Sequence, residues 1–299
     1  MERRQESDIH DQGLQADLAA LRAQFDRRGL LKLLGGTAAL VLVGCGDDRR
    51  SPAPAPTAAP STAVSGATIA ATADEQAVAT VTPIPTQSTP ASACTDAIPK
   101  ETAGPFPANG SNGPNVLVQS GIVRRDIRSS FGISSTVAEG VQLTVRLRIV
   151  DTRNGCRPLP GTAVYLWHCD AKGRYSIYDL PNENYLRGVQ AADDDGWVTF
   201  ESVFPGCYAG RWPHIHFEVY PGVERATSSA NKLATSQLAL PREACEAVYA
   251  RAEYGNSARN LSGLSLETDG IFRDGWQQQL AAVTGDAETG YTATLVVGL

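Results

Sequence analysis

Short runs in which apolar and polar residues alternate dominate the C-terminal two thirds of this sequence. Residues 141–149 (VQLTVRLRI) and 197–200 (WVTF) alternate strictly, which indicates strands with one face buried and one face in solvent. Residues 163–167 (AVYLW) form a continuous apolar run that is typical of a fully buried strand. Residues 214–220 read HIHFEVY, and residues 292–297 fit a closing strand.

Turn-forming pairs separate these runs. Asn-Gly, Asp-Gly and Pro-Gly pairs mark tight turns between strands. They lie at residues 154–155, 195–196, 205–206 and 221–222. The clearest helix candidate is residues 242–252, directly after Pro241. Many short strands at this spacing predict a mainly β fold, an antiparallel β-sandwich with short helices.

The composition differs before residue 94. Residues 46–93 are rich in Pro, Ala, Thr and Ser and carry no sustained apolar period. Such a segment cannot bury enough apolar surface to offset the entropy lost on ordering, so we expect a semi-extended linker. Residues 94–299 carry the β pattern and have the length of one domain.

Residues 1–45 show features of an export signal in the expected order. Arg27 and Arg28 precede an apolar run at residues 30–43, interrupted by Lys32. The run is shorter than the ~20 apolar residues that span a membrane. The basic pair resembles a twin-arginine motif, and Leu-Val-Gly-Cys45 resembles a bacterial lipobox. These resemblances imply export across the bacterial cytoplasmic membrane and lipid anchoring at the cell envelope through Cys45. A buried apolar helix with an incidental cysteine is the alternative.

Few histidines are available for chemistry in residues 94–299. The whole chain has 4 His and a net charge of −6, so no basic surface for nucleic acid is indicated. His214 and His216 stand at i and i+2 of a predicted strand, where side chains share one face. Both imidazoles can therefore reach one metal ion. Tyr208 lies shortly before them, and Tyr175 lies in the segment DAKGRYS.

Several ordered segments resemble the intradiol ring-cleavage dioxygenase family. The segments are GTAVYLWHCDAKGRYS (161–176), FPGCY (204–208), RWPHIHF (211–217), KETAGPF (100–106), LRGVQ (186–190) and DDDGWVTF (193–200). The first three resemble the two halves of the family's iron-binding site. The fourth resembles the entry of its catalytic domain, and the last two are similar to its secreted branch. The resemblance spans about residues 94–237.

The resemblance implies one iron(III) per chain, held by two tyrosinates and two histidines that correspond to Tyr175, Tyr208, His214 and His216. Phenolate is a hard anionic donor, and a bound cation lets a tyrosine with a pKa of ~10 ionise at neutral pH. The alternative for each tyrosine is a buried ring with a hydrogen-bonded hydroxyl, and for Tyr175 taken singly this alternative is favoured. The implied substrates are O2 and a catechol-type aromatic diol, whose ring opens between the two hydroxyl-bearing carbons to give a muconate-type diacid.

Two further residues are implied to act on the substrate. Arg211 corresponds to a family arginine that stabilises negative charge on the bound substrate. Trp212 and Pro213 depart from the family's Arg-Pro-Ala-His order and leave the angle of this arginine open. Gln237 corresponds to a glutamine near the substrate, with a sheet-surface amide as the alternative. His168 is interpreted as structural, because four ligands are already accounted for.

Five cysteines remain once Cys45 is assigned to lipidation, and their spacing does not resemble a zinc site. An exported location permits disulfides, and several pairings are open. The favoured pairs are Cys156 with Cys169 and Cys94 with Cys245. Cys207 lies directly beside Tyr208, where a bridge would be awkward.

A surface-tethered β-sandwich without catalytic activity is the alternative function. Residues 158–164 (PLPGTAV) and 205–208 (PGCY) also resemble collagen-adhesin-type repeat domains. Those domains need neither the His-x-His pair nor Tyr175, so these residues discriminate. Within the dioxygenase family, catechol, protocatechuate, hydroxyquinol and larger lignin-derived catechols all remain open as substrates, as does a member that binds iron without turnover.

Overall fold

The computed structural model describes residues 96–132 and 134–299. The predicted signal (1–45), the linker (46–93), and with them Cys45 and Cys94, lie outside the described residues. Within the described part of the chain, no helix is long and apolar enough to cross a membrane.

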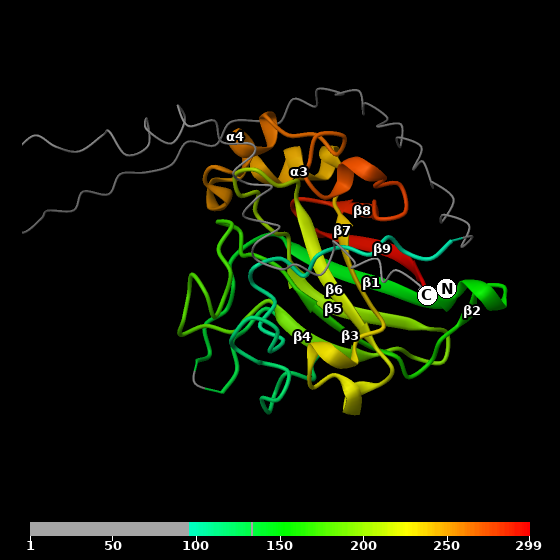
Figure 1. Cartoon of the computed structure of the whole chain (residues 1–299). Helices are drawn as coiled ribbons and strands as arrows, with labels where there is room; N and C mark the ends of the chain where they lie inside the picture. The colour runs from blue at the N-terminus through cyan, green and yellow to red at the C-terminus, as the bar shows by residue number, and fades with distance from the viewer. Residues whose placement is uncertain (1–95, 133) are drawn as a thin grey trace, which may run out of the picture. The chain divides into compact units, whose positions relative to one another are not determined.

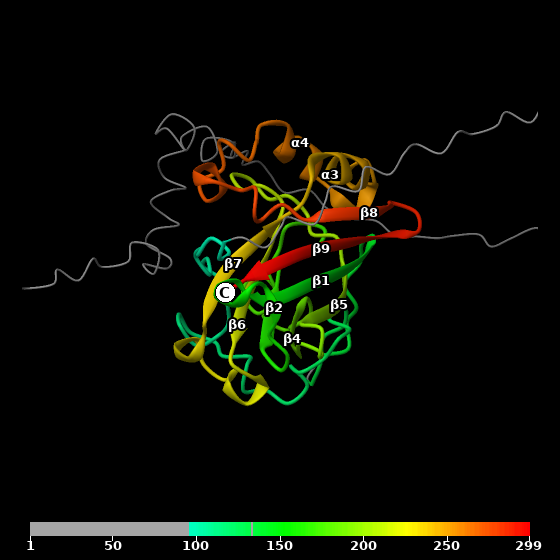
Figure 2. The ribbon, with the colours of Figure 1, turned by 90° about the vertical axis from the view of Figure 1, so that its right-hand side faces the viewer.

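Two sheets stacked face to face form the body of the protein (Figures 1 and 2). One has five strands, in the order β2-β1-β9-β8 with β5 also paired to β1, and the other has four, in the order β4-β3-β6-β7. The five-stranded sheet consists of β1 (Gln142–Asp151), β2 (Arg157–Pro158), β5 (Trp197–Val203), β8 (Ala282–Asp286) and β9 (Gly290–Gly298). The four-stranded sheet consists of β3 (Ala163–Trp167), β4 (Arg187–Ala191), β6 (His214–Tyr220) and β7 (Ala234–Ala239). The prediction of a mainly β sandwich is confirmed.

The main core lies between the two sheets. Alternate residues of β1, such as Val145 and Leu147, pack in one cluster with Ile215 and Phe217 of β6. Since β6 turns these residues inward, its other residues, His214 and His216, face outward. A second apolar cluster covers that outer face, where Tyr165 and other residues of the sheet meet residues 108–122 of the N-terminal segment.

One pairing departs from the predicted antiparallel arrangement. β1 and β9 run parallel over eight residue pairs, from Leu143 with Tyr291 to Val150 with Gly298. Parallel neighbours need a long crossover connection. Here the chain passes through the four-stranded sheet and every helix of the described residues before it returns as β9. Short-range turn signals carry no information on such a return.

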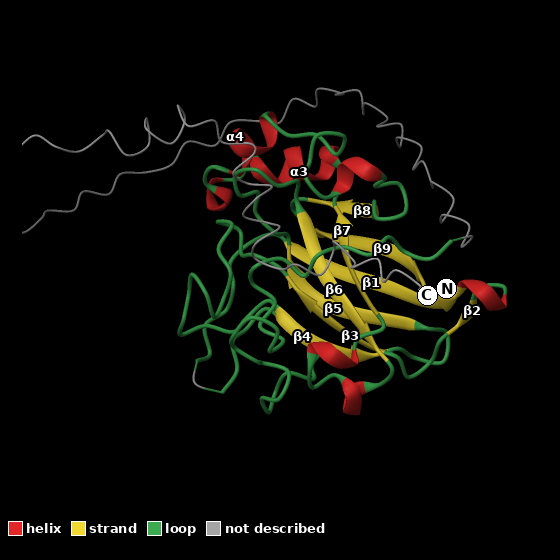
Figure 3. Cartoon of the chain, viewed as in Figure 1, coloured by secondary structure: helices red, strands yellow, loops and turns green. Residues whose placement is uncertain are grey.

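Short helices connect the strands. The helix predicted over residues 242–252 begins as expected after Pro241 and ends earlier, at Tyr249. The helices are α3 (Arg242–Tyr249), α4 (Ser257–Ser262), η2 (Thr152–Asn154), η3 (Val223–Arg225), η4 (Ser229–Asn231), η5 (Ala252–Tyr254) and η6 (Phe272–Asp274). α3 and α4 gather at one end of the strands (Figure 3). The segment from α4 to η6 contributes a residue to the site described below.

Candidate metal centre

The two histidines of β6 direct their Nε2 atoms toward each other. The two Nε2 atoms lie 3.1 Å apart. His214 Nδ1 lies 2.5 Å from the carbonyl oxygen of Trp212 and therefore donates to it, which leaves Nε2 as an acceptor. Burial is the largest cause that lowers the pKa of His214 to about 3, and it also holds the pKa of His216 well below its usual value. Both rings are neutral at pH 7, the form that binds metals.

The two predicted tyrosines lie beside this pair. Tyr208 Oη is 3.2 Å from His214 Nε2. Tyr175 Oη is buried and makes no hydrogen bond within the described residues. The Tyr175 ring lies 6.0 Å from the Tyr208 ring and 6.3 Å from the His216 ring, centroid to centroid. Burial raises the pKa of both phenols far above the ordinary value, so they ionise only if a cation is present.

This donor set fits a hard, highly charged metal ion. Two neutral imidazole nitrogens and two phenol oxygens come together, and one of the oxygens is an orphaned buried hydroxyl. Such an orphan is costly unless something coordinates it. Among the described residues, no group of three His, Cys, Asp or Glu suits a metal. A metal at this place therefore depends on the phenols as well as the histidines.

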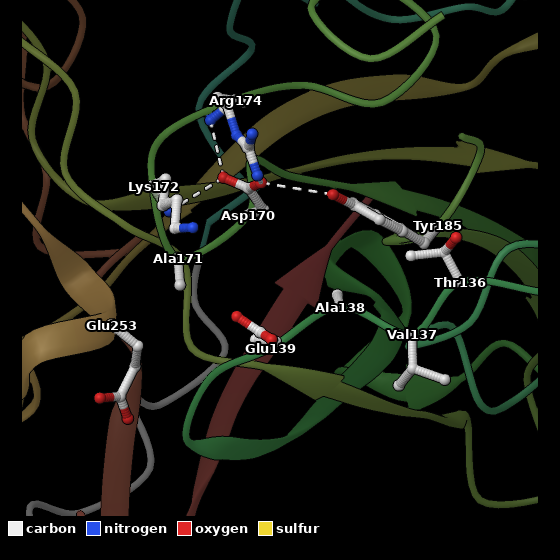
Figure 4. A pocket seen from close by; sticks show the side chains of 10 residues that line it. All are labelled: Thr136, Val137, Ala138, Glu139, Asp170, Ala171, Lys172, Arg174, Tyr185 and Glu253. Carbon is white, nitrogen blue, oxygen red and sulfur yellow. Dashed lines mark hydrogen bonds and ion pairs between the residues drawn. The ribbon is translucent and has the colours of Figure 1, made fainter. Parts of the chain in front are cut away.

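The side chain of Asp170 fixes the loop that carries Tyr175. Its carboxylate accepts hydrogen bonds from the Lys172 and Arg174 amides at 2.9 and 3.0 Å, and from the Arg174 guanidinium at 2.9 and 2.6 Å. Tyr185 donates a further bond at 3.3 Å (Figure 4). The pocket drawn there includes Glu139 and the loop residues, but none of the six predicted site residues.

The loop that carries Tyr208 lies directly against the loop of Tyr175. The Gly206 amide donates to the Asp170 carbonyl at 3.0 Å. A Cβ built at Gly206 would be 2.4 Å from the Ala171 carbonyl oxygen, so only glycine permits this approach. The turn predicted at residues 205–206 is not present, because the structure has its turn at residues 209–210. The close packing at Gly206 brings the two tyrosine loops together instead.

The structure places Arg211 and Gln237 together beside the histidines. Gln237 pairs directly with His216 across β6 and β7, so both side chains share one face. Arg211 Nη2 donates to Gln237 Oε1 at 2.6 Å, which fixes the angle that Trp212 left open in the sequence. Asp269, which the sequence reasoning missed, accepts from Arg211 Nε at 3.0 Å.

His168 lies on the other side of the sheet. Its Nε2 is 2.7 Å from Ser202 Oγ of β5, and its Nδ1 donates to the Cys169 carbonyl at 2.8 Å. It is thus a polar link between the sheets, as the sequence interpretation had it. The neighbouring Trp167 faces the site instead and stacks on His216 at 4.9 Å between ring centroids.

Neither favoured disulfide is present. Cys169, Cys207 and Cys245 are free and buried, whereas Cys156 is disulfide-bonded. Cys156 ends the turn after β1, and Cys169 follows β3 in the opposite sheet, where its thiol contacts the Gly206 carbonyl at 3.4 Å. The sequence prediction did not anticipate that these two cysteines follow strands of different sheets.

Residues 133–223 match a protein-family model described as dioxygenase. A curated relative, catechol 1,2-dioxygenase of Pseudomonas sp. (strain EST1001), is 33% identical over 25% of this chain and 32% of its own length. The chain thus matches about a third of that relative. Among solved structures, an intradiol ring-cleavage dioxygenase from Tetranychus urticae has 24% identity and a TM-score of 0.49, covering 64% of this chain and 90% of that one. The dioxygenase domain of a carbohydrate-binding fusion protein from Streptomyces sp. SirexAA-E has 23% identity and a TM-score of 0.44, covering 68% and 98%.

Proposed function

We propose that this chain, whose residues 133–223 match a dioxygenase family model and which is 33% identical to a catechol 1,2-dioxygenase over 95 residues, is an active intradiol ring-cleavage dioxygenase with one iron(III) per chain. Its substrates are O2 and a catechol-type diol, whose ring it opens between the two hydroxyl-bearing carbons. The observation that carries this proposal is the meeting of two phenol oxygens with two imidazole nitrogens on the buried outer face of β6.

Tyr175, Tyr208, His214 and His216 would hold the iron. When bound, iron(III) ionises the phenols and the diol and makes the ring reactive toward O2. Tyr208 is the less buried of the two tyrosines, so it is the one with room to move when the diol enters. Its phenolate oxygen accepts the proton of one substrate hydroxyl, as a positioned general base.

Arg211 stabilises the negative charge of the bound diol. Burial is the largest single influence and lowers the pKa of Arg211, but Asp269, Tyr208 and Tyr175 together outweigh it, and the net shift is upward. The guanidinium therefore stays charged. A fixed cation in a site shielded from water acts more strongly than one in solvent.

Aromatic rings shield the site from water. Phe106 lies 5.1 Å from the Tyr175 ring and 4.9 Å from the Tyr178 ring. Trp167 covers His216 on one side, and Phe272 lies 6.4 Å from His214 on another. These apolar walls suit a flat aromatic substrate.

The direct test is metal analysis of the purified chain, followed by oxygen uptake with a panel of catechols and identification of the product. We expect one iron per chain, a reddish-brown colour from tyrosinate-to-iron charge transfer, and a muconate-type diacid. A folded protein that stays colourless and inactive after iron reconstitution would instead favour the non-catalytic sandwich. A yellow semialdehyde would mean that the ring is cut outside the diol.

We further propose that the enzyme is exported and lipid-anchored, with the catalytic domain (94–299) held on the linker. The support is the sequence order of Arg27-Arg28, the apolar run and Cys45. Replacing both arginines by lysine should retain the protein in the cytoplasm. Cys45→Ser should release it from membranes, and a variant that remains membrane-bound contradicts the anchor.

A further inference from the structure

Asp269 is a fully buried carboxylate in the connection between α4 and η6. It accepts the amide protons of Ile271 and Phe272 at 2.9 and 3.1 Å, which hold the carboxylate in one orientation. Its remaining contacts are to the segment that leads into β6. Asp269 accepts from the Trp212 amide at 2.7 Å and from Arg211 Nε at 3.0 Å. One carboxylate thus contacts both the backbone and the side chain of the arginine segment.

Arg211 is held on two sides. Nε contacts Asp269, and Nη2 donates to Gln237 Oε1 at 2.6 Å. Gln237 is fixed in turn, because its Nε2 donates to the Thr102 carbonyl at 3.0 Å. Within the described residues Nη1 donates no hydrogen bond. The guanidinium is therefore held through Nε and Nη2, and Nη1 is available to donate to a further acceptor.

The ring of Phe272 completes this arrangement. The Arg211 guanidinium carbon lies 5.9 Å from the centre of the Phe272 ring, which also borders His214. Phe272 also supplies one of the two backbone amides that hold the Asp269 carboxylate. Residues 269–272 thus contact Arg211 through both the carboxylate of Asp269 and the ring of Phe272. The side chain of Arg211 is only 12% exposed.

We propose that Asp269 is the positioning residue of the reaction, which orients Arg211 so that Nη1 meets the negative charge on the substrate. This inference rests on the proposed function. Two effects oppose each other here: the carboxylate attenuates the positive charge of Arg211, and it also fixes its direction. Misplacement of a catalytic group by about 1 Å costs about 10²-fold in rate, so we take orientation as the larger effect.

The test compares Asp269→Asn with wild type in the full, iron-loaded chain. We expect kcat to fall by about 10- to 100-fold, while iron content and colour are unchanged. In an Arg211→Ala background the same substitution should change kcat by less than about twofold, because residues that act through one another are not additive. Asp126→Asn is the matched control. Asp126 likewise accepts from an arginine Nε, at 2.9 Å, and from a backbone amide, at 3.0 Å, and none of its hydrogen-bond partners is a site residue.

A second readout needs no metal. In the metal-free chain, the Nε proton of Arg211 should give a nitrogen-15 NMR signal protected from solvent exchange, and Asp269→Asn should remove that protection. If Asp269→Asn does not fold, Arg211→Lys serves instead. Its ammonium lacks the planar fork in which Nε meets Asp269, Nη2 meets Gln237 and Nη1 stays available, so we expect a similar loss of kcat with the charge retained.

Several results would overturn the inference. They are an unchanged or raised kcat in Asp269→Asn, an equal loss in the Arg211→Ala background, or full activity in Arg211→Lys. A wild-type chain that takes up no iron overturns the proposed function instead. The NMR signal of the metal-free chain then still decides whether Asp269 holds the guanidinium.

Discussion

The two sheets of the sandwich use their outer faces in opposite ways. In the five-stranded sheet, β1 alternates between buried and more exposed residues, and its outer face carries Arg146 and Arg148 over the ring of Trp197. In the four-stranded sheet, β3, β6 and β7 are buried at every position. Its outer face holds the candidate metal centre beneath the N-terminal segment. The sheet that departs from simple alternation is the one that holds the candidate metal centre.

Burial on both faces has a physical consequence for the site. Water would hydrogen-bond to exposed imidazoles and phenols and leave their pKa values near the ordinary ones. Under the N-terminal segment these groups are desolvated, which keeps the histidines neutral and makes an unmetallated phenol pair costly. The five-stranded sheet carries none of the predicted site residues and contributes chiefly apolar burial.

The largest effect is expected for His214→Ala. Loss of this Nε2 removes one of the four donors, so the variant should lose its iron and all measurable turnover. His168→Ala is the matched control, since His168 is an equally buried histidine outside the site. It should keep one iron per chain by metal analysis. Equal iron contents in the two variants would contradict the assignment of the ligands.

Arg211→Ala should show the next largest effect. The arginine contacts Asp269 and Gln237 and none of the four donors directly. We expect about 10²- to 10³-fold lower kcat, as for the loss of one oxyanion-type donor, with the iron colour retained. Single-turnover kinetics with spectra of the resting enzyme measure both quantities. Unchanged turnover would mean that the pocket handles the developing charge differently.

Leu147→Ala tests the other sheet. Leu147 is fully buried in the main core, so the free energy of unfolding should fall by about 2–5 kcal/mol. Urea unfolding measures this loss. The kcat per folded, iron-loaded molecule should stay within about twofold of wild type, as expected for a distant site. A large loss of kcat would show that the core beneath the five-stranded sheet also affects the site on the four-stranded sheet.

His168→Asn tests the link between the sheets through pH. Burial is the main cause that lowers the pKa of His168 from 6.5 to about 4. The unfolded chain takes up this proton as pH falls through 6.5 and the folded chain does not, so stability is lost as pH falls from 6.5 toward 4. The loss is on the order of 3 kcal/mol and should be absent from His168→Asn.

The pH dependence of stability must be compared between His168→Asn and wild type, because the buried Glu101 changes stability with pH in the opposite direction. Burial raises the pKa of Glu101 to about 7, so its contribution to stability falls as pH rises between its ordinary value and 7. The difference between wild type and His168→Asn, measured by urea unfolding of the metal-free chains at pH 7 and pH 5, cancels this contribution. Equal pH dependence in both proteins would contradict a buried neutral His168.

The sequence predicted well what depends on local pattern. The bounds of β3 and β6 are confirmed residue for residue, and β1 and β9 agree closely. The structure also brings the six predicted side chains of the site into one place. Their roles toward iron and substrate stay predictions. The His-x-His motif was informative because the shared face of residues i and i+2 on a strand is a property of a few adjacent residues.

What the sequence could not supply depends on long-range register. The parallel return of β9 beside β1 and the stacking of Trp167 on His216 follow from strand pairings fixed by the whole fold. Asp269 lies 58 residues from Arg211 in the chain, with no spacing rule to connect them. The predicted Cys156–Cys169 pair was wrong for the same reason, since Cys169 follows β3 of the four-stranded sheet and Cys156 lies in the turn after β1 of the five-stranded sheet.

The close contact between the two tyrosine loops bears on how a metal would be captured. The Gly206 amide bond to Asp170, and a spacing that admits no Cβ, fix both loops in the metal-free chain. Small domains that fold only around their ion lose chain entropy on binding, and that loss is subtracted from the affinity. In this chain the loops of both tyrosines are already fixed, so binding a metal would cost little further chain entropy. Little would then be subtracted from the binding free energy that the four donors supply. The domain would therefore be folded before the metal binds, even where the metal is scarce.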